Sequence, residues 1–371
     1  MQVPFSELTD LELTSSSNTL SVIPDSFLGG SSPRLQSLRL RGIPFPGLPA
    51  LLLSHLVHLH LSDIPHLGYI SPEAIVTFIS LLSNLESISL KFRSPRSRPN
   101  REIGFSQSKR SVIRALISLN FQGVIEYLED FVARIDTPRL DNMRITFFNQ
   151  IDFDTPRLAQ FISRTLNLTK TNADVRFEDG FVCVGLDELH FPSPFGFLEI
   201  GVSCREPDWQ LSSIEQLCNS SFTPLSTVEV LSIWHSSINV WENVIENTLW
   251  LRLLLPFTAV KFLYLSDGFA PSIGAALQEL VGGRITEVLP SLQRIFVEGL
   301  EQSGSFQKNI AQFVAARRLS NHPVSISASV EYPYFSDWYE ESNLSEDSDQ
   351  HEDSDGSWDP DRDEDSDKHE D

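Results

Sequence analysis

Residues 35–40 read LQSLRL, and the same phrase returns as LVHLHL at residues 56–61 and as LESISL at residues 85–90. Each copy has an apolar residue, two arbitrary residues, a second apolar residue, one arbitrary residue and a third apolar residue. The spacing recurs at Leu8–Leu11–Leu13, Leu116–Leu119–Phe121, Leu140–Met143–Ile145, Val228–Leu231–Ile233, Val260–Leu263–Leu265 and Leu292–Ile295–Val297. Such self-similarity indicates a repeat architecture, in which each unit buries its apolar side chains against its neighbours.

The segments between the phrases have helical periodicity. Residues Glu73–Ser83 carry apolar side chains at helical spacing and follow Pro72, which favours a first helical turn. Further helices are predicted at Val124–Ile135, from Thr155–Pro156 onward, at Ser272–Val281 and at Phe306–Arg317. Less regular strands are predicted near Val175–Phe177, Leu198–Ile200 and Val324–Ala328. Strands that alternate with helices at a period of about 30 residues predict parallel pairing through right-handed crossovers.

The phrase is the one found in leucine-rich repeats, and it predicts the fold class. We expect an α/β leucine-rich-repeat solenoid over residues 1–331, with a curved parallel sheet on the concave face and helices on the convex face. Residues 91–110 hold seven basic residues and two prolines, so we expect them to form a basic loop inserted into the array.

The negative charge of the chain is concentrated at its C-terminal end. The net charge is −22, and residues 340–371 hold sixteen Asp or Glu residues against Arg362 and Lys368. A segment so charged and so poor in apolar residues buries too little surface to offset its ordering entropy. We therefore predict a disordered acidic tail over residues 332–371.

The residues that flank the last two apolar positions of each phrase alternate outward, onto the concave face. The N-terminal strands present basic residues there, and the C-terminal strands present aromatic ones. The candidate partner-binding residues are Arg39, Arg41, His58, His60, Arg144, Trp234, Phe262, Tyr264 and Phe296. Exposed aromatic residues on a rigid sheet are typical of a protein-binding hot spot. The alternatives are aromatics that pack under a loop or on one another, and a basic row that is ordinary solvated surface.

The sequence offers little sign of catalysis. It contains no HExxH, GxSxG, P-loop or GxGxxG motif, so we predict no catalytic residue and no cofactor. His58 and His60 share a strand face and could grip a metal together with Asp63, but neighbouring outward positions explain the pair, and no metal site is predicted. The basic loop lacks the interleaved aromatics of a nucleic-acid surface apart from Phe92 and Phe105, and nucleic acid is not expected as a partner.

Three cysteines form no CxxC pair, which suits a reducing compartment. The N-terminal residues lack the basic and apolar blocks of a signal peptide. No apolar run reaches the length of about 18 residues that a membrane helix requires. We therefore expect a cytoplasmic or nuclear protein without a membrane segment.

Longer strings in the chain resemble the repeat region of F-box/leucine-rich-repeat proteins of mushroom-forming fungi. These strings are Tyr127–Thr165, Leu249–Ser266 and Ala276–Leu300. The resemblance implies a subunit whose repeats hold a ubiquitylation target while an F-box recruits the ligase. The first repeat here begins by Phe5 with no F-box visible before it, so contact with a ligase complex is expected only if an F-box lies upstream.

The function that we expect is a non-enzymatic protein-interaction module, with its partner on the concave face. The alternative is a nuclear regulator of the acidic-tailed leucine-rich-repeat kind, which would bind basic partners such as histones through its acidic residues.

Overall fold

The computed structural model describes residues 5, 7–15, 34–44, 55–95, 110–149, 153–165, 171–187, 196–220, 223–235, 246–280, 284–298 and 304–328. All of them belong to the first of two units into which the chain divides, Met1–Val330. The predicted tail at 332–371 and residues 96–109 of the predicted basic loop lie outside the described residues.

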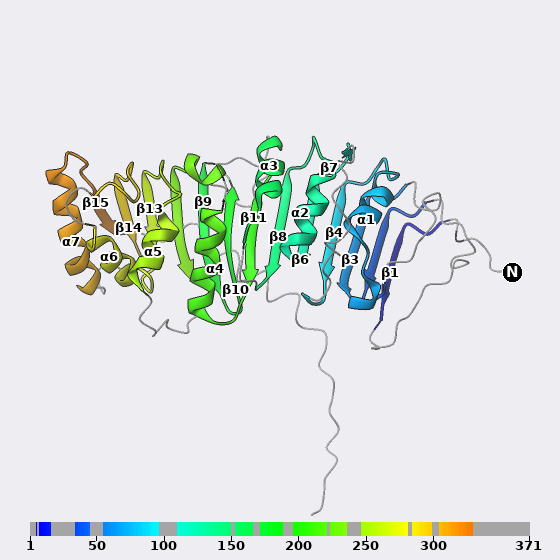
Figure 1. The fold of residues 1–371 in the computed structure, drawn as a ribbon, viewed down its shortest axis with the longest axis horizontal. Coiled ribbons are helices and arrows are strands. Elements are labelled where there is room, and N and C mark those ends of the chain that lie inside the picture. The colour runs from blue at the N-terminus through cyan, green and yellow to red at the C-terminus, as the bar shows by residue number, and fades with distance from the viewer. Residues whose placement is uncertain are drawn as a thin grey trace, which may run out of the picture. The chain divides into compact units, whose positions relative to one another are not determined.

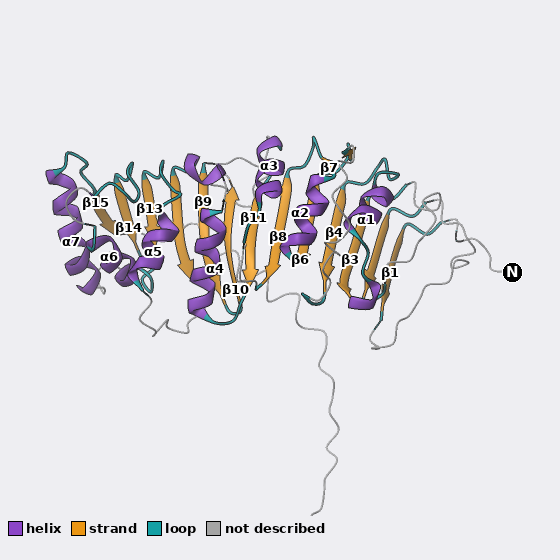
Figure 2. Cartoon of the chain, in the orientation of Figure 1, coloured by secondary structure: helices purple, strands orange, loops and turns teal. Residues whose placement is uncertain are grey.

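Within these ranges the protein is an α/β structure, built from one large and mostly parallel sheet with helices packed on it (Figures 1 and 2). The thirteen strands of the large sheet are β1 (Asp10–Thr14), β2 (Ser37–Arg41), β3 (His58–Ile64), β4 (Ser87–Phe92), β6 (Ser118–Gly123), β8 (Asn142–Phe148), β9 (Asn172–Glu178), β10 (Phe181–Asp187), β11 (Leu198–Ser203), β12 (Val230–His235), β13 (Phe262–Leu265), β14 (Arg294–Val297) and β15 (Ser325–Ala328). A separate short pair joins β5 (Ser111–Val112) to β7 (Ile135–Asp136).

Seven helices occur among the described residues. They are α1 (Pro72–Ile79), α2 (Ile125–Ala133), α3 (Pro156–Arg164), α4 (Pro207–Asn219), α5 (Asn247–Leu254), α6 (Ala270–Gln278) and α7 (Gly304–Leu319). Two 3₁₀ turns, η3 (His66–Gly68) and η5 (Thr223–Thr227), also lie in the described part of the chain.

The recurring apolar phrase forms the strands and the core. The middle residue of each phrase pairs in register with its counterpart on the next strand, as Leu38 does with Leu59 and Leu59 with Ile88. The row that results crosses the whole sheet: Leu11, Leu38, Leu59, Ile88, Leu119, Met143, Leu198, Leu186, Ala173, Leu231, Leu263, Ile295 and Ile326. All but its two end members are buried. The period-two alternation of the phrase thus directs the apolar side chains of each strand toward the helices.

The centre of the sheet differs from the prediction. The strand order there is β8-β11-β10-β9-β12, so the sheet does not follow the order of the chain. The predicted strands near Val175–Phe177 and Leu198–Ile200 are β9 and β11, and each is parallel to its outer neighbour. Between them lies β10, which the sequence analysis did not predict and which is antiparallel to both. The expectation of parallel pairing throughout is therefore wrong at this point.

The physical reason is the connection between β9 and β10. Only Asp179 and Gly180 separate the two strands, and Gly180 has a positive φ of 75°. A two-residue Asp-Gly turn joins antiparallel strands, whereas a parallel pair needs a crossover of a dozen or more residues. The hairpin therefore replaces one helical return.

Five of the seven helices match the predicted ones to within a few residues: α1, α2, α3, α6 and α7. Helix α1 begins as expected, with Pro72 in its first turn and the Ser71 hydroxyl accepting a hydrogen bond from the Ala74 amide at 3.2 Å. Strand β4 includes Lys91 and Phe92, which the prediction had assigned to the basic loop. Helices α4 and α5 were not predicted.

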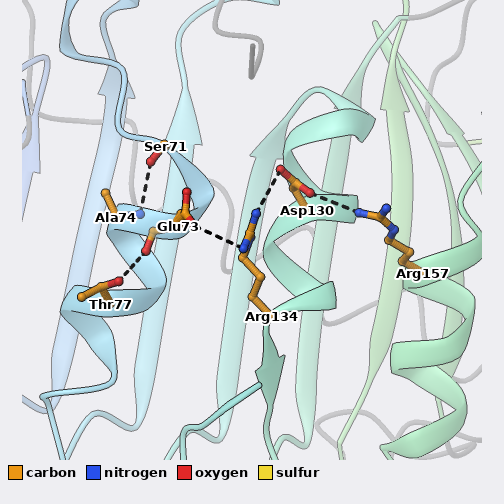
Figure 3. A network of polar contacts seen from close by, with 7 residues as sticks. All are labelled: Ser71, Glu73, Ala74, Thr77, Asp130, Arg134 and Arg157. Atoms are coloured by element: carbon orange, nitrogen blue, oxygen red, sulfur yellow. Dashed lines mark hydrogen bonds and ion pairs between the residues drawn. The ribbon is translucent and has the colours of Figure 1, made fainter. Parts of the chain in front are cut away.

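Neighbouring helices are tied by polar side chains, as Figure 3 shows for α1, α2 and α3. Arg134 of α2's C-terminal cap lies between Glu73 of α1 at 3.5 Å and Asp130 of α2 at 3.9 Å, and Asp130 in turn pairs with Arg157 of α3 at 3.1 Å. Glu129 caps α3 from outside, because its carboxylate accepts hydrogen bonds from the Arg157 amide at 3.0 Å and the Leu158 amide at 2.8 Å. Burial raises the pKa of Glu129 despite these two bonds.

Replacing Glu129 by Ala should remove the cap of α3. The residue at the N-cap of that helix, Thr155, makes no side-chain cap bond of its own, so two amides would lose their acceptor. We expect the free energy of unfolding to fall by about 1–2 kcal/mol, measured by urea denaturation. The control is Glu73→Ala, which removes an exposed carboxylate from Arg134 while Asp130 remains beside that arginine, and it should cost less than about 1 kcal/mol. Equal losses in the two variants would contradict the capping role.

Candidate functional site

The helices cover one face of the sheet (Figure 1). The opposite face, which we call the open face, carries the residues that alternate with the buried row. Its central row, linked strand to strand by the register, is Glu12, Arg39, His60, Ser89, Asn120, Arg144, Glu199, Gly185, Asp174, Ser232, Tyr264, Phe296 and Ser327. Most of the predicted site residues lie in this row or beside it.

The predicted basic residues all lie on the open face, but they are not equally available. Arg41 pairs with Asp63 at 2.8 Å, and Arg144 pairs with Glu199 at 2.8 Å. Arg39 is 4.0 Å from Glu12, and both side chains are more than half exposed. Two of the three predicted arginines are therefore neutralised by a carboxylate of the protein itself.

His58 and His60 point from the same face of β3, as their spacing predicted. His58 is exposed, whereas His60 is partly buried. Burial lowers the pKa of His60, and the positive charges of Arg39, His58 and Lys91 lower it further. The Asp63 carboxylate, considered above as a third metal ligand, is engaged by Arg41. Across the part of the chain that the structure describes, no group of three or more His, Cys, Asp or Glu side chains could hold a metal ion.

The centre of the open face holds an ion-pair cluster that the sequence analysis missed. Arg176 of β9 pairs with Asp174 of the same strand at 2.8 Å and with Glu199 of β11, and Glu199 also accepts from Arg144 of β8. The Arg176 and Glu199 side chains are only 12% and 10% exposed. A period-two run of polar residues, Asn172, Asp174, Arg176 and Glu178, was the available signal.

Small residues on β10 make this cluster possible. Arg176 and Glu199 lie on strands that are separated by β10, so their side chains must cross that strand to meet. The residues of β10 beneath them are Cys183 and Gly185. A Cβ atom added at Gly185 would lie 2.4 Å from the Asp174 carboxylate, which shows how closely the acid crosses the glycine. Glycine at this position thus leaves the space that the ion pairs occupy.

The charged groups of the ion-pair cluster shift the pKa values of one another. Burial by itself lowers the pKa of Arg176, but the nearby negative charge, Asp174 foremost, outweighs it and raises that pKa overall. Burial raises the pKa of Asp174, against the opposing effect of Arg176. Burial also raises the pKa of the Cys183 thiol well above its usual range. All three cysteines are buried and free of disulfides, and a buried thiol with a raised pKa is a poor nucleophile.

The predicted aromatic residues Phe262, Tyr264 and Phe296 form a contiguous group, which we call the aromatic patch. Tyr264 of β13 pairs in register with Phe296 of β14, and their rings stack at a centroid distance of 4.4 Å and an angle of 8°. The Phe262 ring is 6.5 Å from that of Phe296. All three side chains keep partial exposure, so the rings pack on one another and still present surface.

Two arginines extend the aromatic contacts of the open face. The guanidinium of Arg294 lies 5.6 Å from the centroid of Phe296, at the edge of the aromatic patch. Trp234 lies in the row of Arg176, whose guanidinium is 5.9 Å from its ring centroid. The structure therefore connects Trp234 to the ion-pair cluster, through a cation–π contact.

Comparison with models of known families gave no match, and no curated protein matches the chain significantly. No helix in the described ranges is long and apolar enough to span a membrane.

Glu199→Gln should weaken the ion-pair cluster, because it keeps the shape of the side chain and removes the charge that Arg176 faces. Arg176 keeps Asp174 as a partner, so we expect the free energy of unfolding to fall by about 2 kcal/mol in urea denaturation near neutral pH. The matched control, Glu12→Gln, faces the exposed Arg39 and should cost at most about 1 kcal/mol. A cost for Glu199→Gln no larger than that of the control would show that the cluster contributes little to stability.

Proposed function

We propose that this chain is a leucine-rich-repeat solenoid that binds another protein through its open face. The repeated phrase supports the family assignment, because its three apolar positions are buried in nearly every copy and its flanking residues reach the open face. The helical returns between parallel strands support it as well. The β9–β10–β11 hairpin is a departure from the repeat, which it interrupts without breaking the sheet.

The observation that carries the binding function is the aromatic patch. Tyr264 and Phe296 stack on adjacent strands of a sheet face that no described helix covers, with Phe262 beside them. Clustered aromatic side chains with partial exposure are enriched at protein-binding hot spots. Their rotamers are fixed by the stack, so little side-chain entropy remains to be lost when a partner binds. A protein with an apolar anchor is the partner that this surface favours.

The resemblance to F-box/leucine-rich-repeat proteins of mushroom-forming fungi would make that partner a ubiquitylation target. Support for this narrower role comes from the sequence strings at Tyr127–Thr165, Leu249–Ser266 and Ala276–Leu300. Recruitment of a ligase complex depends on an F-box upstream of the repeats and is a separate question from binding by the open face.

The double variant Tyr264→Ala/Phe296→Ala should lose the partner. Truncating a hot-spot residue costs about 2 kcal/mol or more, which corresponds to a loss of affinity of about 30-fold or more. Quantitative mass spectrometry of proteins captured from a native extract, followed by titration of the enriched partner, measures this loss. The matched control is Trp209→Ala, because Trp209 is an exposed aromatic residue on helix α4, away from the open face.

Thermal unfolding monitored by circular dichroism should show that both variants remain folded. A partner that binds the double variant and the parent equally would remove the aromatic patch from the proposed function. A partner lost only from Trp209→Ala would place the binding surface on the helices instead.

A further inference from the structure

Four positively chargeable side chains gather on strands β2, β3 and β4 of the open face. Arg39 and His60 are register partners, and Lys91 lies two residues beyond Ser89, the partner of His60 on β4. His58 lies two residues before His60 on the same strand face. Strands are spaced about 4.8 Å apart, so two strand steps bring all four side chains within reach of one bound segment. We call Arg39, His58, His60 and Lys91 the cationic cluster.

The cationic cluster differs from Arg41, Arg144 and Arg176, the arginines of the open face that are neutralised by carboxylates. Arg144 and Arg176 share Glu199, and Arg41 is taken by Asp63. Within the described residues, the carboxylate nearest to the cluster is Glu12, 4.0 Å from Arg39 with both side chains largely exposed. A pair of that kind contributes little energy, so the guanidinium of Arg39 can exchange Glu12 for another anion at small cost.

The surroundings of the cationic cluster are polar and small. His58 lies in register between Ser37 and Ser87, and His60 has Ser89 on its other side. Ser37 and Ser89 are buried and Ser87 is partly exposed, and the small size of these side chains leaves room for groups that approach the imidazole rings and Lys91. The raised positive potential here is also what lowers the pKa of His60, after burial.

We propose that the cationic cluster docks an extended acidic segment of a partner protein, with carboxylates on alternate residues. The donors lie across three neighbouring strands and do not converge on one point, as they would in a pocket for a single phosphate. Alternate residues of an extended chain lie about 6.8 Å apart on one side, a spacing that matches His58 and His60 along β3. This inference rests on the proposed function only in taking the partner to be a protein. The residues that it uses are at least seven strand steps from the aromatic patch.

The test uses a fluorescent peptide of alternating Glu and Ser residues and the full chain at a salt concentration of about 0.05 M, where screening is weak. The double variant Arg39→Gln/Lys91→Gln should bind this peptide about tenfold more weakly than the parent, measured by fluorescence anisotropy. A peptide with Gln in place of Glu should not bind. The matched control is Arg139→Gln, which removes an exposed arginine in the turn before β8.

Protonation of the histidines adds a second readout. The charged groups that act on His60 are Arg39 on β2, His58 on β3 and Lys91 on β4, and Glu12 of β1 lies beyond Arg39. In the row of His58, Asp10 of β1 lies beyond Ser37. A bound carboxylate favours the imidazolium form, so the affinity of the parent should rise as the pH falls from about 7.5 to about 5.5, by about tenfold for each unit by which binding raises a histidine pKa. The peptide carboxylates stay ionised over this range. His58→Asn/His60→Asn should abolish the rise.

Equal affinity of the parent and Arg39→Gln/Lys91→Gln would overturn the proposal, and so would a pH dependence that survives in His58→Asn/His60→Asn. Tyr264→Ala/Phe296→Ala should bind the peptide as the parent does. The two proposals can therefore fail separately. The variants of the cationic cluster leave the aromatic patch intact, and Tyr264→Ala/Phe296→Ala leaves the cationic cluster intact.

Discussion

The constraint on which this structure depends is that the apolar row must continue from strand to strand without a gap. No single strand and helix has a core of its own, because each buries its leucine or isoleucine mainly against the units on either side. Leu59, for example, is fully buried between Leu38 and Ile88. Burying one such side chain contributes about 1.5–3 kcal/mol, so the array is stable only while the register is kept.

The hairpin at the centre satisfies the same constraint in another way. Two reversals of the chain restore its direction, so β9 and β11 are both parallel to their outer neighbours although β10 is not. Leu186 of β10 takes its place in the buried row between Leu198 and Ala173. On the open face, the ion pair of Arg176 and Glu199 crosses β10 and joins the strands on its two sides. On the apolar side of the sheet, the hairpin keeps the register of the buried row. On the polar side, an ion pair joins the strands on either side of β10.

The strands and helices could be predicted from the sequence where the spacing of apolar residues is regular. The phrase around Leu38 or Leu263 carries its own alternation, so its strand, its buried side and its exposed side all follow from a few residues. Helix α4 was missed because Gln210, Ser213 and Glu215 are buried among its apolar residues and blur the helical period. The pairing of charges on the open face depends on strand order. Arg144 meets Glu199 only because β11, and not β9, follows β8 in the sheet.

The open face is thereby divided into parts with different roles. The charged side chains at its centre form ion pairs with one another, and a partner that bound them would have to replace these buried contacts. The cationic cluster on β2–β4 and the aromatic patch on β13 and β14 lie on either side of that centre.

Eight strand steps separate β3 from β13, about 38 Å measured along the sheet. A partner that joins both surfaces must therefore be extended or carry two docking elements. Modest affinities at the two sites would then combine into strong binding, with selectivity for partners whose two elements match this separation.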